Sequence, residues 1–198
     1  MRQKTIDKIT SKWYNGKKKR QVKRMGTKSR LRDLCRISLF TVLICISSWV
    51  YIPFAIPFTL QTFAVFSCIF CLGGKKGSIT VLVYLLMGAL GLPVFSHFSG
   101  GIGALLGSGG GFLFGFLISA LIYTLLEKTS VHRLIIAFIS MLFCYISGVL
   151  WFFAVYSESK GISGLMSAFL VCVLPFIIPD VIKILLAMYI SKRLKKHI

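Results

Sequence analysis

The feature that most constrains the fold of this chain is the absence of charged side chains from three long segments. Residues 37–74, 77–126 and 134–157 contain no Asp, Glu, Lys or Arg. Each run exceeds the roughly 20 apolar residues that span the hydrocarbon core of a bilayer. With 56% hydrophobic residues and a mean hydropathy of +0.82, the chain is also more apolar than a typical soluble domain. These observations predict a polytopic membrane protein.

Helix-breaking residues divide the runs into several hydrophobic spans. Pro53 and Pro57 are expected to end the first helix, because proline removes a backbone donor and restricts the residue before it. Residues 161–191 would form a helix of about 46 Å, too long for a hydrocarbon core of roughly 30 Å, so Pro175 and Pro179 should divide it. The predicted spans of this all-α, six-helix bundle are about 36–52, 59–72, 77–92, 110–126, 134–156 and 180–194, the last preceded by an interfacial or re-entrant helix at 162–174.

Basic residues are concentrated at the two ends of the chain. Residues 1–36 hold fourteen of the 24 Lys and Arg residues, and residues 192–196 hold four more. With the N-terminus in the cytoplasm, 22 of the 24 lie inside, Lys160 alone lies outside and Lys183 lies in the membrane. Because cytoplasmic segments are enriched in Lys and Arg, both termini are expected to face the cytoplasm.

The sequence divides into a basic arm, residues 1–33, and a single transmembrane domain, residues 34–196. The arm is expected to be mobile and to stay on the cytoplasmic side, where its charge also favours anionic lipid headgroups. The net charge of +19 raises nucleic acid as a partner, but a nucleic-acid site would interleave aromatic residues with base-reading groups. We therefore expect no nucleic-acid partner, and whether Met25 is the true start stays open.

Neither the cysteines nor the histidines form a recognisable metal or redox site. Cys68 and Cys71 form a CxxC pair, but with no second pair and no nearby His, packing explains them better. The histidines are scattered, and no nucleophile or metal set converges elsewhere. The sequence thus predicts neither an enzyme nor a cofactor.

Residues 91–116 (GLPVFSHFSGGIGALLGSGGGFLFGF) are uncharged, glycine-rich and as apolar as a membrane span. The glycines between residues 100 and 115 permit close backbone approach. Non-helical backbone at membrane depth is tolerated where it is buried in protein or lines a cavity. We therefore predict a loop packed into the bundle that walls a pocket open to the outside. The alternative is a helix-packing motif of small residues.

An acidic and a basic residue lie three positions apart in LPFIIPDVIK, residues 174–183. Ionisable residues inside a membrane are by default candidates for a functional site. We place Asp180 near the N-terminus of the last span, so that it and Lys183 reach an outer pocket. The other predicted pocket residues are Thr59, Gln61, Thr62 and Ser99. The alternatives are an N-cap role for Asp180, a salt bridge to Lys183, and a last span at 161–179 with Asp180 at the cytoplasmic edge.

Four segments, in their order and spacing, resemble the BioY family: IPFTLQT, LGGKKGSITVLVYLLMGALGLPVF, FSGGIGALLGSGGGFLFGF and LPFIIPDVIKILLA. The resemblance covers about residues 34–196. BioY proteins are the biotin-binding, substrate-specific components (S-components) of energy-coupling factor (ECF) vitamin transporters. They are six-helix membrane bundles that bind the vitamin near their outer face. The resemblance implies that this chain binds biotin for uptake, and it favours Asp180 at the outer start of the last span.

The resemblance also implies site residues. Asp180 and Lys183 match the Asp and Lys that follow the family's proline pair, and Gln61 matches the Gln of its Leu-Gln signature. The carboxylate of Asp180 is expected to accept an N–H of the biotin ureido group, and Lys183 to donate to the ureido oxygen or hold Asp180 ionised. The other implied contacts are Ser99, Gly100, Gly101, Phe112 and Trp151.

The chain departs from the family pattern at several of these positions. Ser99 stands where the family often has Asn or a small residue, and Phe112 stands where Tyr is usual. The family's Pro-Gly-Asp is replaced by residues 178–180, in which the proline is shifted. In the first span, Ser38 and Val42 hold the small-xxx-small positions that are expected to dock on the coupling subunit.

The chain contains no nucleotide-binding motif, so ATP-driven transport would depend on partners. The resemblance implies an ECF transmembrane coupling subunit and two ATPase subunits, in the cytoplasmic (inner) membrane of a bacterium. Biotin would be the transported ligand rather than a cofactor. Two alternatives remain, an S-component for another vitamin and a membrane scaffold protein without a ligand.

Overall fold

The computed structural model describes residues 27–53, 57–156 and 162–194. The chain divides into two compact units, Met1–Arg36 and Ile37–Ile198, which are described separately. In the first unit residues 27–36 are helical, and the rest of the predicted basic arm, Met25 included, lies outside the described residues. In the second unit the described chain begins with helical residues 37–49.

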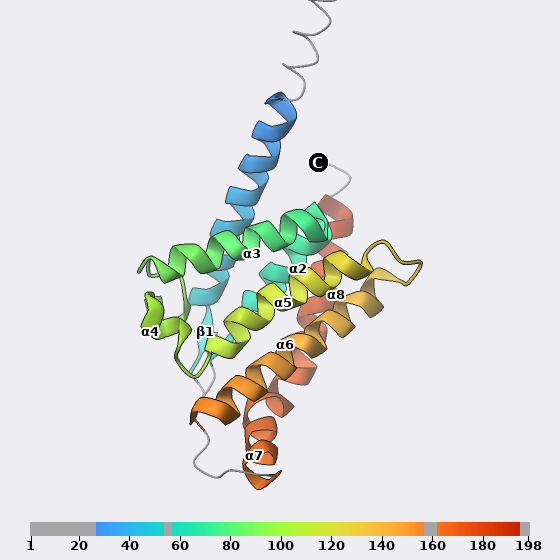
Figure 1. The fold of residues 1–198 in the computed structure, drawn as a ribbon. Coiled ribbons are helices and arrows are strands. Elements are labelled where there is room, and N and C mark those ends of the chain that lie inside the picture. Colours follow the sequence, from blue (N-terminus) through green and yellow to red (C-terminus); the bar gives the residue numbers. More distant parts are fainter. Residues whose placement is uncertain (1–26, 54–56, 157–161, 195–198) are drawn as a thin grey trace, which may run out of the picture. The chain divides into compact units, whose positions relative to one another are not determined.

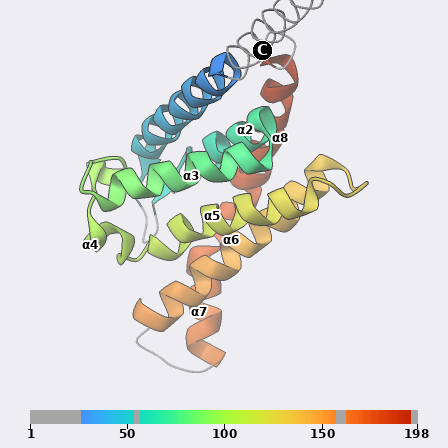
Figure 2. The same cartoon turned by 45° about the horizontal axis from the view of Figure 1, so that its top comes forward.

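The second unit is mostly helical, as the charge-free runs predict. Its longer helices after residue 49 are α2 (Gln61–Leu72), α3 (Gly74–Ala89), α5 (Gly110–Leu126), α6 (Arg133–Tyr156), α7 (Ile162–Cys172) and α8 (Ile177–Leu194). Helix α5 lies along α6, α2 packs against α8, and α3 packs against α5 (Figure 1, Figure 2). Apolar side chains fill the space between them, among them the fully buried Phe66, Ile69, Tyr84, Ile136 and Ile184.

A small hairpin follows the first helix, so the all-α prediction is wrong at this point. Strands β1 (Tyr51–Ile52) and β2 (Phe58–Thr59) pair antiparallel, with Tyr51 opposite Thr59. Pro53 and Pro57 fall between the paired residues, whereas the helix already ends at Trp49, four residues before the first proline that was expected to end it. The residue before a proline also favours extended backbone, which suits a strand better than a continued helix.

The sequence GGKKGS is a helix start and not the turn that the sequence predicts. Helix α2 passes into α3 at Gly73 alone, whose φ of +83° is readily adopted only by glycine. Lys75 and Lys76 therefore lie in the first turn of α3. The backbone N–H of Gly74 donates to Oε2 of Glu127 over 2.6 Å, so an acidic side chain satisfies a free donor at this helix N-terminus.

The last apolar segment is divided near Pro175, as predicted. Helix α7 ends at Cys172, and the 3₁₀ turn η2 (Leu174–Phe176) separates it from α8. Pro179, by contrast, does not break the chain, because it lies in the first turn of α8, where no intrahelical donor is lost. Helix α8 consequently begins at Ile177, three residues earlier than expected.

The glycine-rich segment combines the two predicted alternatives. Between α3 and α5 lie the 3₁₀ turn η1 (Ser96–Phe98) and the short helix α4 (Ile102–Leu105) in an otherwise irregular loop. The later glycines belong to α5 and pack against α6. A Cβ at Gly115 would lie 2.9 Å from Sγ of Cys144, and one at Gly111 would collide with Trp151. The first part is therefore a loop, and the last part is a small-residue helix contact.

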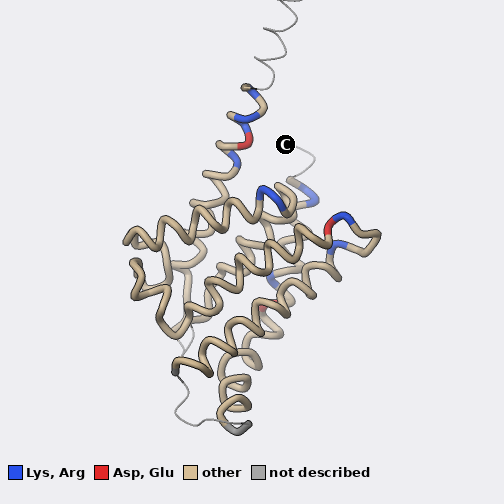
Figure 3. Tube along the Cα trace, in the orientation of Figure 1, with Lys and Arg blue, Asp and Glu red and all other residues tan. Residues whose placement is uncertain are grey.

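Within the described residues, two helical stretches are long and apolar enough to cross a membrane by length and composition. They are Arg133–Val155 and Gly164–Leu194, with mean hydropathies of 2.3 and 2.4, and the second runs through the η2 turn. On α6, Leu142, Ile146 and Leu150 form an exposed apolar stripe at helical spacing. Apart from an interior acidic and basic pair, the described charged residues of this unit lie near helix ends (Figure 3).

Candidate functional site

A cavity of about 420 Å³ lies within the second unit, between the hairpin, the glycine-rich loop and helices α2, α5, α6 and α8. Its walls come from segments far apart in the sequence that the bundle brings together. Of the predicted contacts, the lining includes Gln61, Ser99, Gly100, Phe112, Asp180 and Lys183, together with Thr59 and Thr62 of the predicted pocket.

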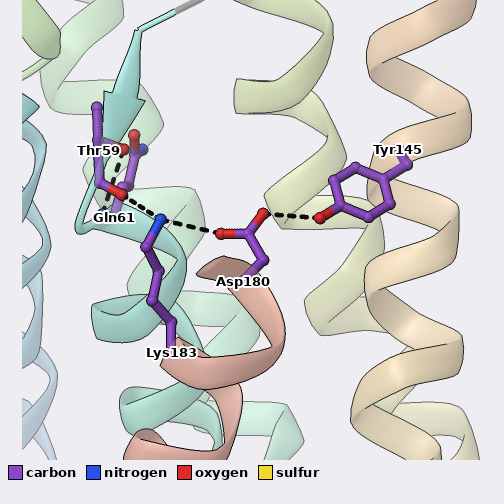
Figure 4. Close-up of polar contacts among 5 residues, drawn as sticks. All are labelled: Thr59, Gln61, Tyr145, Asp180 and Lys183. Atoms are coloured by element: carbon purple, nitrogen blue, oxygen red, sulfur yellow. Dashed lines mark hydrogen bonds and ion pairs between the residues drawn. The ribbon is translucent and has the colours of Figure 1, made fainter. Parts of the chain in front are cut away.

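Asp180 and Lys183 form a buried ion pair on the first turns of α8. The ammonium Nζ of Lys183 lies 3.0 Å from Oδ1 of Asp180 and donates to the Thr59 carbonyl over 2.7 Å (Figure 4). It also lies 3.8 Å from the centre of the Phe58 ring, within range of a cation–π contact. The salt bridge considered as an alternative is thus present, and both partners still line the cavity.

The N-cap alternative for Asp180 is wrong, because α8 begins at Ile177 and places Asp180 inside the helix. Its second carboxylate oxygen, Oδ2, instead accepts a hydrogen bond of 2.8 Å from the hydroxyl of Tyr145 on α6 (Figure 4). The charge of Asp180 is therefore held from two helices, by an ammonium on one oxygen and a phenol on the other.

Tyr145 is the site residue that sequence reasoning missed. It lines the cavity, and its hydroxyl is the one side-chain donor to Asp180 from another helix among the described residues. A signal existed in the sequence, because a phenol in the middle of an uncharged span needs a polar partner. Nothing in the sequence, however, indicated that this partner would be a carboxylate 35 residues away.

Gln61 opens helix α2, and its side chain lines the cavity. Its amide nitrogen Nε2 donates to the hydroxyl of Tyr84 over 3.0 Å. That hydroxyl in turn donates to the backbone carbonyl of Val94 over 3.2 Å. All three residues are buried, so the orientation of the Gln61 amide is set inside the protein rather than by water.

The glycine-rich loop forms the wall that contains Ser99 and Gly100. The hydroxyl of Ser99 donates to the Ser96 carbonyl over 2.7 Å, which leaves its lone pairs for the cavity. A Cβ at Gly100 would collide with the carbonyl of Leu92, so only glycine allows this close backbone approach. His97, which also lines the cavity, has a φ of +60°, and its ring packs at a tilt against that of Tyr51, with 4.0 Å between the ring centres.

Two predicted contacts, Gly101 and Trp151, do not line the cavity. The indole Nε1–H of Trp151 donates to the Gly107 carbonyl of the loop over 3.1 Å. The N–H of Gly101 donates to the Gly88 carbonyl over 2.7 Å and starts α4. Both hydrogen bonds therefore stabilise the loop, although neither residue contributes to the lining of the cavity. Phe112 does reach the cavity, and its ring rests on Gly148 of α6.

The remaining predicted residues lie away from the cavity. Ser38 and Val42 are exposed one helical turn apart, so a docking role for them stays a prediction. Cys68 is fully buried in the hydrophobic core. Within the described part of the chain, no group of three His, Cys, Asp or Glu residues could hold a metal ion.

Comparisons with known proteins identify the family of this chain. The model of the BioY family matches residues 18–198. The biotin transporter BioY of Thermotoga maritima is 37% identical over 169 residues, which cover 84% of this chain and 97% of that relative. A probable biotin transporter BioY of Pyrococcus horikoshii is 33% identical over 167 residues, 84% of this chain and 98% of the relative.

A solved structure has the same fold. It is the S-component for biotin from an ECF-type ABC transporter, with a TM-score of 0.73 and 28% sequence identity. The match covers 85% of this chain and 93% of that one. A family model that spans most of the sequence, supported by relatives aligned over nearly their whole length, shows that this chain belongs to the BioY family.

Proposed function

We propose that this chain is the biotin-binding component of an ECF-type transporter and takes up biotin from the outer side of the membrane. The observation that carries the proposal is the Asp180–Lys183 pair, which lines a cavity of about 420 Å³ in a chain of the BioY family. Relatives named as biotin transporters and a solved S-component for biotin support it. Membership in a family of transporter components agrees with the prediction that the chain is not an enzyme.

The chemistry of the cavity suits biotin. The ureido group offers two N–H donors and one carbonyl acceptor beside an apolar ring. Each oxygen of Asp180 has one protein partner, so a lone pair remains on each to accept a ureido N–H as a charge-assisted bond. Lys183 has three N–H donors and uses two of them on Thr59 and Asp180, which leaves the third for the ureido oxygen. Phe112 and Phe176 supply apolar surface for the ring.

The proposed transport also needs partners and an orientation. The absence of a nucleotide-binding motif from the sequence supports an ECF coupling subunit and two ATPase subunits as the source of energy. The exposed face with Ser38 and Val42 is the proposed docking site for the coupling subunit. The proposal includes six spans in a bacterial cytoplasmic membrane, as the family resemblance implies. The distribution of basic residues supports an orientation with both termini and the arm of residues 1–33 inside.

Ligand titration of the detergent-purified full chain tests the function. Calorimetry should show tight binding of biotin and hardly any binding of riboflavin or thiamine, because the wrong vitamin would leave the buried polar groups of Gln61 and Asp180 unpaired. Equal binding of all three would reduce the function to that of a general vitamin S-component. Binding of none of them would favour a scaffold protein.

A further inference from the structure

Gln61 is held by a chain of hydrogen bonds that leads away from the cavity. Its Nε2 donates to the hydroxyl of Tyr84, and that hydroxyl donates to the carbonyl of Val94. The hydroxyl of Ser48 also lies 2.6 Å from this carbonyl as a donor. Gln61 is 4% exposed and Tyr84 is 1% exposed, so solvent does not replace these bonds.

The Val94 carbonyl fixes the direction of the chain. A backbone carbonyl accepts and never donates, and a phenol has a single proton. Because Tyr84 donates its one hydroxyl proton to the Val94 carbonyl, its oxygen can only accept from Gln61. Gln61 must therefore present its NH₂ group to Tyr84. If the Gln61 amide were flipped, the hydroxyl of Tyr84 would have to donate to the amide oxygen instead of to Val94. The Tyr84 oxygen and the Val94 carbonyl oxygen would then lie 3.2 Å apart with no proton between them.

The carbonyl oxygen of Gln61 is consequently left as an acceptor in the residue's cavity-lining side chain. Within the described residues, no group donates to this Oε1 atom. Asp180, held by Lys183 and Tyr145, is a second acceptor in the same cavity. Two fixed acceptors suit a ligand that brings two N–H donors.

We propose that Tyr84 is a positioning residue that sets the ligand selectivity of this site. By holding Gln61 as an acceptor, Tyr84 makes the site select cyclic ureas, with two N–H donors, against cyclic carbamates of the same shape, in which one N–H is an oxygen. This inference rests on the proposed function, because it takes the ligand to be biotin. Tyr84 itself does not line the cavity, and it acts through Gln61 alone.

The test compares biotin with its two cyclic carbamate analogues, each with one ureido N–H replaced by oxygen. The full chain, purified in detergent, is titrated with each ligand by calorimetry. The parent should prefer biotin at least about tenfold over the analogue whose ring oxygen faces Gln61, because a hydrogen bond is lost and two acceptors meet. In Tyr84→Phe the amide is free to turn its NH₂ toward that oxygen. Biotin should then bind about two- to tenfold more weakly, and the preference over this analogue should disappear.

Two further variants make the result decisive. Tyr123→Phe removes another buried phenol, on α5 beside Phe70 and outside the cavity, and should leave the preference unchanged. Gln61→Met removes the acceptor itself and should abolish the preference, and it takes the place of Tyr84→Phe if that variant does not fold. An unchanged preference in Tyr84→Phe or in Gln61→Met overturns the inference while biotin binding, and so the proposed function, stands. A parent that binds no biotin overturns both.

Discussion

The ion pair of Asp180 and Lys183 allows effects on stability and on ligand binding to be separated. The two residues are 4% and 6% exposed and meet at 3.0 Å. Asp180→Asn would leave the buried ammonium without its counter-ion, with the face of Phe58 and neutral acceptors such as the Thr59 carbonyl as its partners. Removing one partner of a buried ion pair costs about 3–5 kcal/mol, so we expect a clearly lower melting temperature. Lys183→Met strands the carboxylate in the same way.

Both single variants should also bind biotin more weakly. Asp180→Asn replaces a charged acceptor with an amide, and a lost hydrogen bond to a charged group is worth about 1.5–3 kcal/mol, or about ten- to 150-fold in affinity. The double variant, Asp180→Asn with Lys183→Met, no longer contains an unpaired charge. Replacing a whole buried pair is often neutral for stability, so its melting temperature should recover toward the parent. Its affinity should stay as low as that of the weaker single variant.

The assay pairs a ligand-free thermal unfolding curve, followed by tryptophan fluorescence, with a calorimetric titration of biotin for each variant. Lys192→Met, which removes an exposed charge from the last turn of the same helix, is the matched control and should change neither. A double variant that regains affinity together with stability would show that the pair only supports the fold. Single variants that bind biotin like the parent would refute the site assignment altogether.

Three further predictions concern neighbouring features. Tyr145→Phe should weaken biotin binding about tenfold or more, because Asp180 loses its phenol donor, and calorimetry should show no further loss when the change is added to Asp180→Asn. Gly115→Ala should lower the melting temperature by forcing α5 away from α6, whereas Gly103→Ala, whose Cβ meets nothing within 4 Å, should not. In a chain without native cysteines, Lys160→Cys, outside the described residues, should react with an impermeant thiol reagent added to intact cells and Lys76→Cys should not. The reverse pattern would refute the proposed orientation.

The sequence predicts most of the helices because the physics that selects them is local. Charge-free runs identified the apolar segments, and Pro175 marked the division before α8. Pro179 was misread, since its effect depends on where the helix starts and not on the residue alone. The turn between α2 and α3 was misplaced for a similar reason. One glycine with positive φ, Gly73, is enough to separate the two helices, where the six residues of GGKKGS were expected to form the turn.

The site was predictable to the extent that its residues carry charge or belong to a recognised motif. Asp180, Lys183 and Gln61 line the cavity, and the contacts with biotin that the family resemblance implies for them stay a prediction. Tyr145 and Trp151 were misjudged because both are amphipathic aromatic residues on α6, and the rotation of that helix decides which of them faces the cavity. Such rotations follow from packing against α5, where glycines allow close contact, and not from periodicity.

The bond between Lys183 and Thr59 joins positions 124 residues apart in the chain. A ribosome delivers the hairpin and the glycine-rich loop to the membrane long before α8 is made. Until that last helix inserts, the carbonyl of Thr59 has no ammonium group as a hydrogen-bond donor, and the cavity lacks the side chains of Asp180 and Lys183. The binding site can therefore be completed only after α8 has been inserted, and a chain truncated anywhere before α8 would lack its ionic residues.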